Sequence, residues 1–322
     1  MRLSETFSES SFAFEGKDFL TLADYTPEEI KYFIFLGLEL KEKQKKGIIY
    51  QPLQGKTLGM IFEKSSTRTR VSFEVGMIQL GGHALFLSKQ DLQIGRGETI
   101  ADTARVLSRY LDGIMMRTDD QKKLVEMARH ATIPVINGLS DFFHPTQAIA
   151  DFMTIYENKG KLQGLKLAFL GDGNNVAHSL LIGGAKLGMN IAIASPSGYE
   201  PKKEIVELAE EEAMKTGSKI LITNDPKEAI EGADVVYTDV WASMGQEEEK
   251  ELRKKIFAPY QVNQELVMRA KEDYIFMHCL PAYRELEVTE EILEGKHSVV
   301  FDEAENRLHA HKAILVALMG KK

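Results

Sequence analysis

The chain has 322 residues, of which 43% are hydrophobic and 27% charged, so it has the composition of a soluble globular protein and the length for two domains of ordinary size. A formal net charge of −8 argues against nucleic acid or an anionic membrane surface as a partner. No apolar run approaches the roughly 18 residues that a membrane helix needs. A single cysteine excludes an intramolecular disulfide and a cysteine-built zinc site, and it fits a reducing, cytoplasmic compartment.

The first clear element is a helix that follows a polar lead-in, residues 1 to about 15. Thr26-Pro27-Glu28-Glu29 combines a helix cap, a proline at the first helical position and a capping-box glutamate, so we expect a helix from there to about Lys46. Strand-like apolar runs follow at 58–62, 84–87, 113–116 and 133–136 and alternate with helical stretches. This alternation is typical of a parallel sheet with crossover helices.

A second alternation of strands and helices begins after Gly160 and Gly164. Its strand-like runs are 167–170, 191–194, 219–223, 235–238, 275–278 and 299–301, and a last helix is expected from about Asn306 to Met319. We therefore predict an α/β fold of two parallel-sheet α/β domains joined by interdomain helices. The expected boundaries are 1–150 and 151–305, with the C-terminal helix, about 306–322, packing back on the first domain.

The most informative stretch is Ser65-Ser66-Thr67-Arg68-Thr69-Arg70, where a strand ends and a helix begins at about Thr67. The first turn of a helix has backbone N–H groups without intrahelical partners and the positive end of the helix dipole. The Ser66, Thr67 and Thr69 hydroxyls together with Arg68 would complete a phosphate cradle. The alternative is an ordinary Ser/Thr cap with solvated arginines, although two arginines in one first turn are unfavourable without an anionic partner.

Two further groups stand where ligands bind α/β proteins. Arg117 ends the buried run 113–116 with a charge, at the carboxyl end of a predicted strand. His144-Pro145-Thr146-Gln147 opens a helix, so an imidazole and an amide can both donate hydrogen bonds to a carbonyl oxygen there. A capping turn is the structural alternative for His144.

Gly171-Asp172-Gly173-Asn174-Asn175-Val176 follows a predicted strand and opens a helix, which is where a dinucleotide fingerprint would lie. Val176 replaces the third glycine, and the next strand ends without an acidic residue for a ribose. Nicotinamide binding is therefore the less favoured interpretation of this turn. An asparagine at a strand end can instead bind the carboxylate or amine of a small ligand.

Acidic and thiol side chains end two later strands. Asp239 suits a ligand ammonium group, and Ser243-Met244-Gly245 is typical of a loop that closes over a site. Cys279 suggests a nucleophile, but adjacent strand residues point to opposite faces, so His278 is a poor base for it and a ligand contact or buried thiol is favoured. His309 and His311 are two residues apart on a predicted helix, which points them apart and predicts no metal site.

These motifs resemble the signatures of the ornithine carbamoyltransferase family, in that family's order along nearly the whole chain. Ser66-Thr67-Arg68-Thr69-Arg70 and His144-Pro145-Thr146-Gln147 are shared with aspartate carbamoyltransferases, whereas Ser243-Met244-Gly245 and His278-Cys279-Leu280-Pro281 mark the ornithine enzymes. The resemblance implies a transferase that moves the carbamoyl group of carbamoyl phosphate to the δ-amine of L-ornithine, giving L-citrulline and phosphate in arginine metabolism. It implies no cofactor, no metal, and a homotrimer or a multiple of trimers.

The resemblance also implies roles for single residues. The first domain would bind carbamoyl phosphate and the second ornithine, and Arg68, Arg117, His144 and Cys279 would be catalytic. The carbamoyl phosphate contacts would be Ser66, Thr67, Arg68, Thr69, Gln93, Arg117, His144, Gln147, Cys279, Leu280 and Arg307, with Gln93 supplied across a subunit boundary. The ornithine contacts would be Asn175, Asp239, Ser243 and Met244.

Three alternatives stay open from the sequence. The first is a carbamoyltransferase for a modified ornithine or for putrescine, which a comparison of amine substrates would reveal. The second is a nicotinamide-dependent oxidoreductase built on the glycine-containing turn 171–176, which a nucleotide-binding measurement would reveal. The third is a pure binding module, but such a module does not need a cationic phosphate site together with an amine-reading half.

Overall fold

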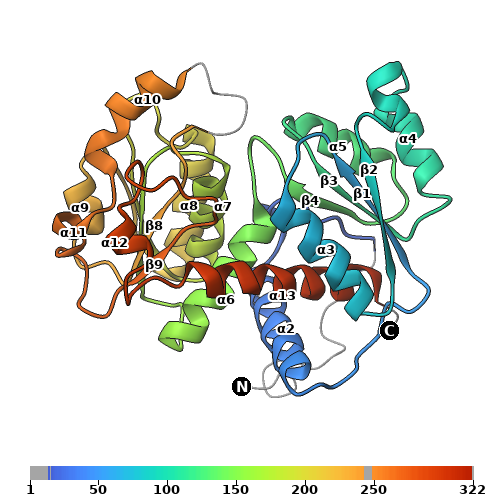
Figure 1. Cartoon of the computed structure of the whole chain (residues 1–322), viewed down its shortest axis with the longest axis horizontal. Coiled ribbons are helices and arrows are strands. Elements are labelled where there is room, and N and C mark those ends of the chain that lie inside the picture. Colours follow the sequence, from blue (N-terminus) through green and yellow to red (C-terminus); the bar gives the residue numbers. More distant parts are fainter. Residues whose placement is uncertain (1–13, 15, 243–248, 321–322) are drawn as a thin grey trace. The chain divides into compact units, whose positions relative to one another are not determined.

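The computed structural model describes residues 14, 16–242 and 249–320, and these fold into two compact units. The first unit is Met1–Met153 with Glu305–Lys322, and the second is Thr154–Ala304. Each unit contains a wholly parallel sheet, with strand order β2-β1-β3-β4 in the first and β7-β6-β5-β8-β9 in the second. The predicted fold class, two parallel-sheet α/β domains, is therefore confirmed (Figure 1).

The elements follow one another as the sequence pattern predicts, strand after helix. Up to the first interdomain helix they are η1 Leu22–Asp24, α2 Pro27–Lys45, β1 Thr57–Phe62, α3 Thr67–Gln79, β2 His83–Ser88, η2 Gln93–Arg96, α4 Ile100–Leu107, β3 Gly113–Arg117, α5 Gln121–His130, β4 Val135–Leu139 and α6 Pro145–Lys159. They continue with β5 Lys166–Leu170, α7 Asn175–Lys186, β6 Asn190–Ala194, α8 Lys203–Thr216, β7 Ile220–Thr223, α9 Pro226–Ile230, β8 Val235–Thr238, α10 Lys250–Phe257, η4 Ala258–Tyr260, α11 Gln264–Val267, β9 Ile275–Met277, α12 Glu290–Leu293 and α13 Val300–Met319. Helices α6 and α13 each contribute residues to both units.

Side chains that alternate along the strands build the two cores. Ile114 and Met116 of β3 pack with Leu124 and Met127 of α5 on one face of the first sheet. In the second unit, alanines and valines of β5, β6 and β8 pack against α9, α11 and α12. Since strands of a parallel sheet are covered on both faces, such continuous apolar runs are expected for them.

Local signals set the helix starts. The predicted capping box is present, because Thr26 accepts from the backbone N–H of Glu29 and the Glu29 carboxylate accepts from that of Thr26. Helix α3 begins at Thr67 with Ser66 as its cap, and α6 begins at Pro145, directly after His144. The described helices include none that is long and apolar enough to cross a membrane.

One predicted strand is wrong. Val300 and Phe301 belong to α13, which begins at Val300 and not near Asn306. Val299 precedes the helix, and among the described residues a single parallel bridge between Phe276 and Ser298 continues the sheet there. Three apolar residues have no periodicity that separates strand from helix, whereas Asp302 and Glu303 in the first turn favour a helix start. The run 133–136 is also shifted, because β4 begins after Pro134, at Val135.

Candidate functional site

In the first unit, the polar side chains lie at the carboxyl ends of parallel strands. The helix start at Thr67 follows β1, and Arg117 is the last residue of β3, which pairs with β1 at Phe62. Ligands of open α/β sheets bind at this edge, because loops and helix N-termini converge there. The structure therefore gives the predicted cradle the expected position in its sheet.

Thr69 is the point at which three distant segments meet. Its hydroxyl accepts a hydrogen bond from the Arg307 guanidinium at 2.8 Å, and the Arg117 guanidinium lies 3.5 Å from the same oxygen. All three side chains are buried. Two guanidinium groups at one helix start give the site a strong positive potential, because burial weakens the screening by water.

The first turn of α3 adds backbone donors to this positive charge. Ser66 caps the helix by accepting from the backbone N–H of Thr69 at 3.3 Å, and Arg68 and Thr67 precede Thr69 in the same turn. Arg68 is half-buried and Thr67 is exposed. An exposed hydroxyl, free backbone N–H groups and arginines in one turn can bind a phosphate through charge-assisted hydrogen bonds.

His144 and Gln147 are buried at the start of α6 in the same unit. Burial, together with the nearby positive charges of Arg307 and Arg117, lowers the pKa of His144 well below its ordinary value. The imidazole is therefore neutral at physiological pH, when one ring nitrogen donates and the other accepts. Gln147 donates its amide N–H to Asp151 at 2.8 Å, which fixes the orientation of its amide group.

No hydrogen bond among the described residues joins Gln93 to this cluster. Gln93 opens η2, which follows β2, and its side chain is exposed. The backbone carbonyl of Gln93 accepts a hydrogen bond from the backbone N–H of Glu98, just after η2. The predicted contact of Gln93 with a neighbouring subunit stays a prediction.

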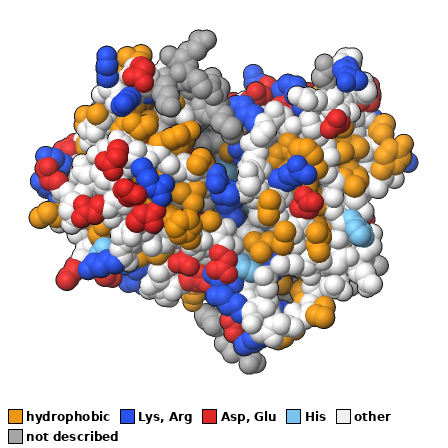
Figure 2. Space-filling view, viewed as in Figure 1, with side chains coloured by type: hydrophobic (Ala, Val, Ile, Leu, Met, Phe, Trp, Pro, Cys, Tyr) orange, Lys and Arg blue, Asp and Glu red, His pale blue; other side chains and the backbone are white. Residues whose placement is uncertain are grey.

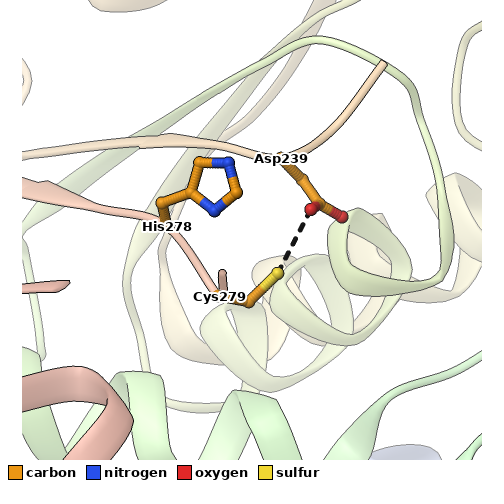
Figure 3. Close-up of side chains that lie close together, drawn as sticks. All are labelled: Asp239, His278 and Cys279. Carbon is orange, nitrogen blue, oxygen red and sulfur yellow. Dashed lines mark hydrogen bonds between the residues drawn. The ribbon is translucent and has the colours of Figure 1, made fainter. Parts of the chain in front are cut away.

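In the second unit, Asp239 is the hub of a hydrogen-bonded cluster at the carboxyl end of β8. Its two carboxylate oxygens accept from the Asn174 amide at 2.7 Å, from the Val240 backbone N–H at 2.8 Å and from the Cys279 thiol at 3.2 Å. Figure 3 shows the Asp239 and Cys279 side chains pointing toward one another. Asp239 is buried. Strands β8 and β9 are neighbours in the sheet, so the carboxylate and the thiol that follow them lie at the same edge.

Asn174 is the residue of this cluster that the sequence interpretation missed. Its side-chain oxygen caps α7 by accepting from the backbone N–H groups of Val176 and Ala177, while its amide nitrogen donates to Asp239. An asparagine immediately before a helix start is a strong cap signal, and that signal could have distinguished Asn174 from Asn175. Asn175, the predicted ligand contact, is the first residue of α7 and is half-buried.

The hydrogen bonds of His278 show that it is not the base of Cys279. Its Nδ1 accepts from the backbone N–H of Leu280 at 2.9 Å, which leaves the proton on Nε2, facing Glu287 at 3.1 Å. Strand β9 ends at Met277, so His278 and Cys279 lie beyond it and do not alternate between its faces. Their side chains are therefore close together. The prediction about the base is supported, but its strand argument does not apply at this position.

The same hydrogen bonds decide whether this cluster can bind a metal. Ligand atoms of Asp239, His278 and Cys279 lie within 4.8 Å of one another (Figure 3). A metal needs a lone pair from each ligand, yet the Nδ1 lone pair of His278 holds the Leu280 backbone and Nε2 faces Glu287. The imidazole would have to give up one of these partners before it could ligate an ion.

The turn that contains Cys279 has an unusual backbone. Leu280 has φ of +57°, in the left-handed region that non-glycine residues rarely adopt. Such conformations occur where surrounding contacts enforce them, and they cluster at functional sites. The hydrogen bond from Leu280 to His278 is one such contact. Ser243 and Met244, the other predicted ligand contacts near Asp239, lie outside the described residues.

The nicotinamide alternative conflicts with the geometry around Gly173. In a dinucleotide fingerprint the second glycine lets the pyrophosphate approach the backbone. At Gly173 this space is filled by the chain itself, since a Cβ there would lie 2.2 Å from the Pro201 nitrogen, and the Gly173 N–H donates to the Tyr199 carbonyl at 2.8 Å. The close approach that glycine permits here serves the packing of the 196–201 loop.

Models of one family match both units. Residues 17–157 match the aspartate/ornithine carbamoyltransferase carbamoyl-P binding domain, and residues 163–318 match the Asp/Orn binding domain of the same family. The two matches cover most of the chain, in the order in which the two polar clusters occur. The first match contains Ser66, Arg117 and His144, and the second contains Asp239 and Cys279.

Full-length relatives agree with the family models. The chain is 65% identical to the ornithine carbamoyltransferase of Anoxybacillus flavithermus over 95% of this chain and 97% of the relative, and 58% identical to the anabolic ornithine carbamoyltransferase of Pyrococcus furiosus over 95% and 97%. A solved structure of ornithine carbamoyltransferase from Pyrococcus furiosus superimposes with a TM-score of 0.94 at 57% identity, covering 97% of this chain and 100% of that one. This chain therefore belongs to the aspartate/ornithine carbamoyltransferase family.

Proposed function

We propose that the protein is an ornithine carbamoyltransferase, which forms L-citrulline and phosphate from carbamoyl phosphate and L-ornithine. The observation that carries the proposal is the convergence of Arg307 and Arg117 on Thr69, at a capped helix N-terminus. Such a site suits a phosphate dianion. The Asp239 carboxylate in the second unit suits an ammonium group. A relative is named anabolic, and we place the activity in arginine biosynthesis.

The proposed binding roles divide between the two units. Unit 1 binds carbamoyl phosphate through Ser66, Thr67, Arg68, Thr69 and Arg117, and His144 and Gln147 contact its carbamoyl group. Unit 2 binds ornithine through Asn175, Asp239, Ser243 and Met244. Cys279, Leu280 and Arg307 act at the reacting carbon. The family resemblance supports these roles, and the charges of the two clusters agree with them.

The proposed reaction needs only donors that the chain supplies. The lone pair of the uncharged δ-amine forms a bond to the carbonyl carbon, and the bond from that carbon to the phosphate oxygen breaks. The proton that the amine loses passes to the departing phosphate or to water. Negative charge grows on the carbonyl oxygen and on the leaving phosphate. A neutral His144 can donate one hydrogen bond to the first of these, and the arginines stabilise the second.

We also propose that the enzyme works as a homotrimer in the cytoplasm. The edge strand β2 exposes Leu85 by 48% and Phe86 by 39%, and Val71 of the adjacent helix α3 is exposed by 52%. Figure 2 shows hydrophobic side chains at the surface where Figure 1 places α3 and β2. Exposed apolar edge strands are characteristic of association surfaces, and the exposed Gln93 follows this strand. The chain has a single cysteine, Cys279, which fits a reducing compartment.

A comparison of amine substrates tests the proposed function. Purified protein is assayed for carbamoyl transfer from carbamoyl phosphate to ornithine, putrescine, N-acetylornithine and aspartate under identical conditions. We expect the kcat/KM for ornithine to exceed that for each other amine at least tenfold. The reason is that the second unit is proposed to bind an amino acid that has a side-chain amine. A higher value for putrescine or N-acetylornithine would assign the protein to a different carbamoyltransferase.

A further inference from the structure

A pocket in the first unit has a buried lysine in its wall and is lined by none of the residues of the phosphate cradle. Its volume is about 290 Å³, and it lies among the C-terminal part of α2, the loop after it, the end of α3 and α13. Its lining includes Leu40, Gln44, Ile48, Ile78, Gln79 and Lys312. We propose that this pocket binds a small organic monocarboxylate with an apolar tail, whose carboxylate pairs with Lys312.

No carboxylate of the described residues balances the charge of Lys312. The residue is 3% exposed, and its ammonium group donates to the side-chain oxygens of Gln44 at 2.7 Å and Gln79 at 3.1 Å. These are neutral acceptors, and no carboxylate of the described residues forms an ion pair with Lys312. Because a buried cation is costly without an anionic partner, this site lacks one negative charge.

The neighbouring carboxylates already have partners of their own. On α2, Glu39 pairs with Lys43 and Glu42 pairs with Lys46; on α3, Glu74 pairs with Arg70; and on α13, Glu305 pairs with Lys41. His309, on the same helix as Lys312, is also ionisable. Burial, together with the positive charge of Lys312, lowers the pKa of His309 to about 3, so its imidazole is neutral. No group on these three helices therefore supplies the missing charge.

The ionisation of Lys312 agrees with this unbalanced position. Burial lowers its pKa to about 8, so the ammonium form loses its proton over a pH range in which an ordinary lysine stays charged. A bound carboxylate would favour the charged form and raise this pKa. Ligand binding near pH 8 is therefore expected to take up a proton.

The shape and polarity of the pocket select the class of ligand. Lys43, the other lysine of the wall, is paired with Glu39 at 2.8 Å and lies over the Tyr50 ring, so one unbalanced positive charge remains. One charge matches a monocarboxylate better than a phosphate dianion. Ile48 and Ile78 are exposed at the rim, whereas Leu40 and Leu80 are buried, which gives an alkyl tail apolar surface to cover.

Calorimetric titration of the assembled, full-length protein with hexanoate tests the proposal. Acetate carries the same charge without the tail, and hexylamine carries the tail with the opposite charge. We expect hexanoate to bind at least tenfold more tightly than either, with proton uptake near pH 8 measured in two buffers of different ionisation heat. Its affinity is expected to fall as the pH rises above 8, because Lys312 loses its charge.

Two variants separate the ammonium group from the rest of the pocket. Lys312→Met keeps the aliphatic stem and is expected to weaken hexanoate binding at least tenfold and to abolish its pH dependence. Lys43→Met, the matched control in the same wall, is expected to change the affinity by less than twofold. Absence of hexanoate binding to the wild type would overturn the proposal, including the case in which a second copy of the chain covers the pocket. Equal effects of the two variants would overturn it as well.

Discussion

Thr69 illustrates how one side chain joins segments that are far apart in the sequence. Its hydroxyl accepts from Arg307, 238 positions further along, and lies near Arg117 at the end of another strand. The motif around Thr69 predicts a phosphate cradle because its signal is local. The contact with Arg307 depends on how α13 packs against α3, and no local pattern encodes that.

The second cluster gives a residue-scale prediction. Asp239→Asn keeps the shape of the side chain but removes its charge, so we expect the affinity for ornithine to fall more than tenfold and that for carbamoyl phosphate to change less than twofold. Equilibrium binding of each substrate provides the measurement. Similar losses for both substrates would show that Asp239 does not read the amine.

At the scale of elements, α13 positions Arg307 at Thr69 and also carries two buried histidines, His309 and His311, that make the stability of the fold depend on pH. His311 stacks on Phe73 with ring centroids 3.8 Å apart, and its Nδ1 lies 2.9 Å from the Ser72 hydroxyl, which ties α13 to α3. Burial lowers the pKa of His311 well below its ordinary value and that of His309 to about 3. Both imidazoles are therefore held neutral in the folded state.

The buried histidines predict acid sensitivity. Below the ordinary histidine pKa of about 6.5 the unfolded chain binds protons that the folded chain does not, so the free energy of unfolding falls as the pH falls. Each of His144, His309 and His311 contributes at most about 1.4 kcal/mol per pH unit to this slope. Urea unfolding between pH 8 and pH 5 measures it.

Matched substitutions show which histidines cause the pH dependence of the free energy of unfolding. His309→Gln is expected to make the dependence on pH shallower by the contribution of one group, whereas His83→Gln, at the exposed start of β2, is expected to leave it unchanged. A wild-type stability that stays constant down to pH 5 would mean that the folded state accepts these protons. In that case burial would not keep the imidazoles of α13 neutral.

Sequence patterns predicted elements where signals were local and long, and failed where they were short. The capping box at Thr26 and the cap at Ser66 lie where the structure has them. The three residues 299–301 were too few to separate strand from helix, and α13 begins at Val300. The dual role of Asn174 became visible only when β8 brought Asp239 beside the start of α7.

At the scale of the whole molecule, a shared site predicts complementation between subunits. If Gln93 of one subunit completes the site of a neighbour, Gln93→Ala and Arg68→Ala chains that are inactive alone should regain partial activity when mixed under reversible dissociation. Some interfaces would then pair an intact Gln93 with an intact Arg68, as a cyclic trimer requires. No recovery in a preparation that mass measurement shows to contain mixed trimers would mean that each site comes from one chain.

The most direct test of the account is a product balance with labelled carbamoyl phosphate and L-ornithine. We expect one citrulline per phosphate released by the wild type, a loss on the order of 100-fold or more in kcat/KM for Arg68→Ala, and near wild-type turnover for Arg70→Ala, whose side chain pairs with Glu74 instead. Phosphate release without citrulline, or equal turnover by the wild type and Arg68→Ala, would contradict carbamoyl transfer at the α3 cradle.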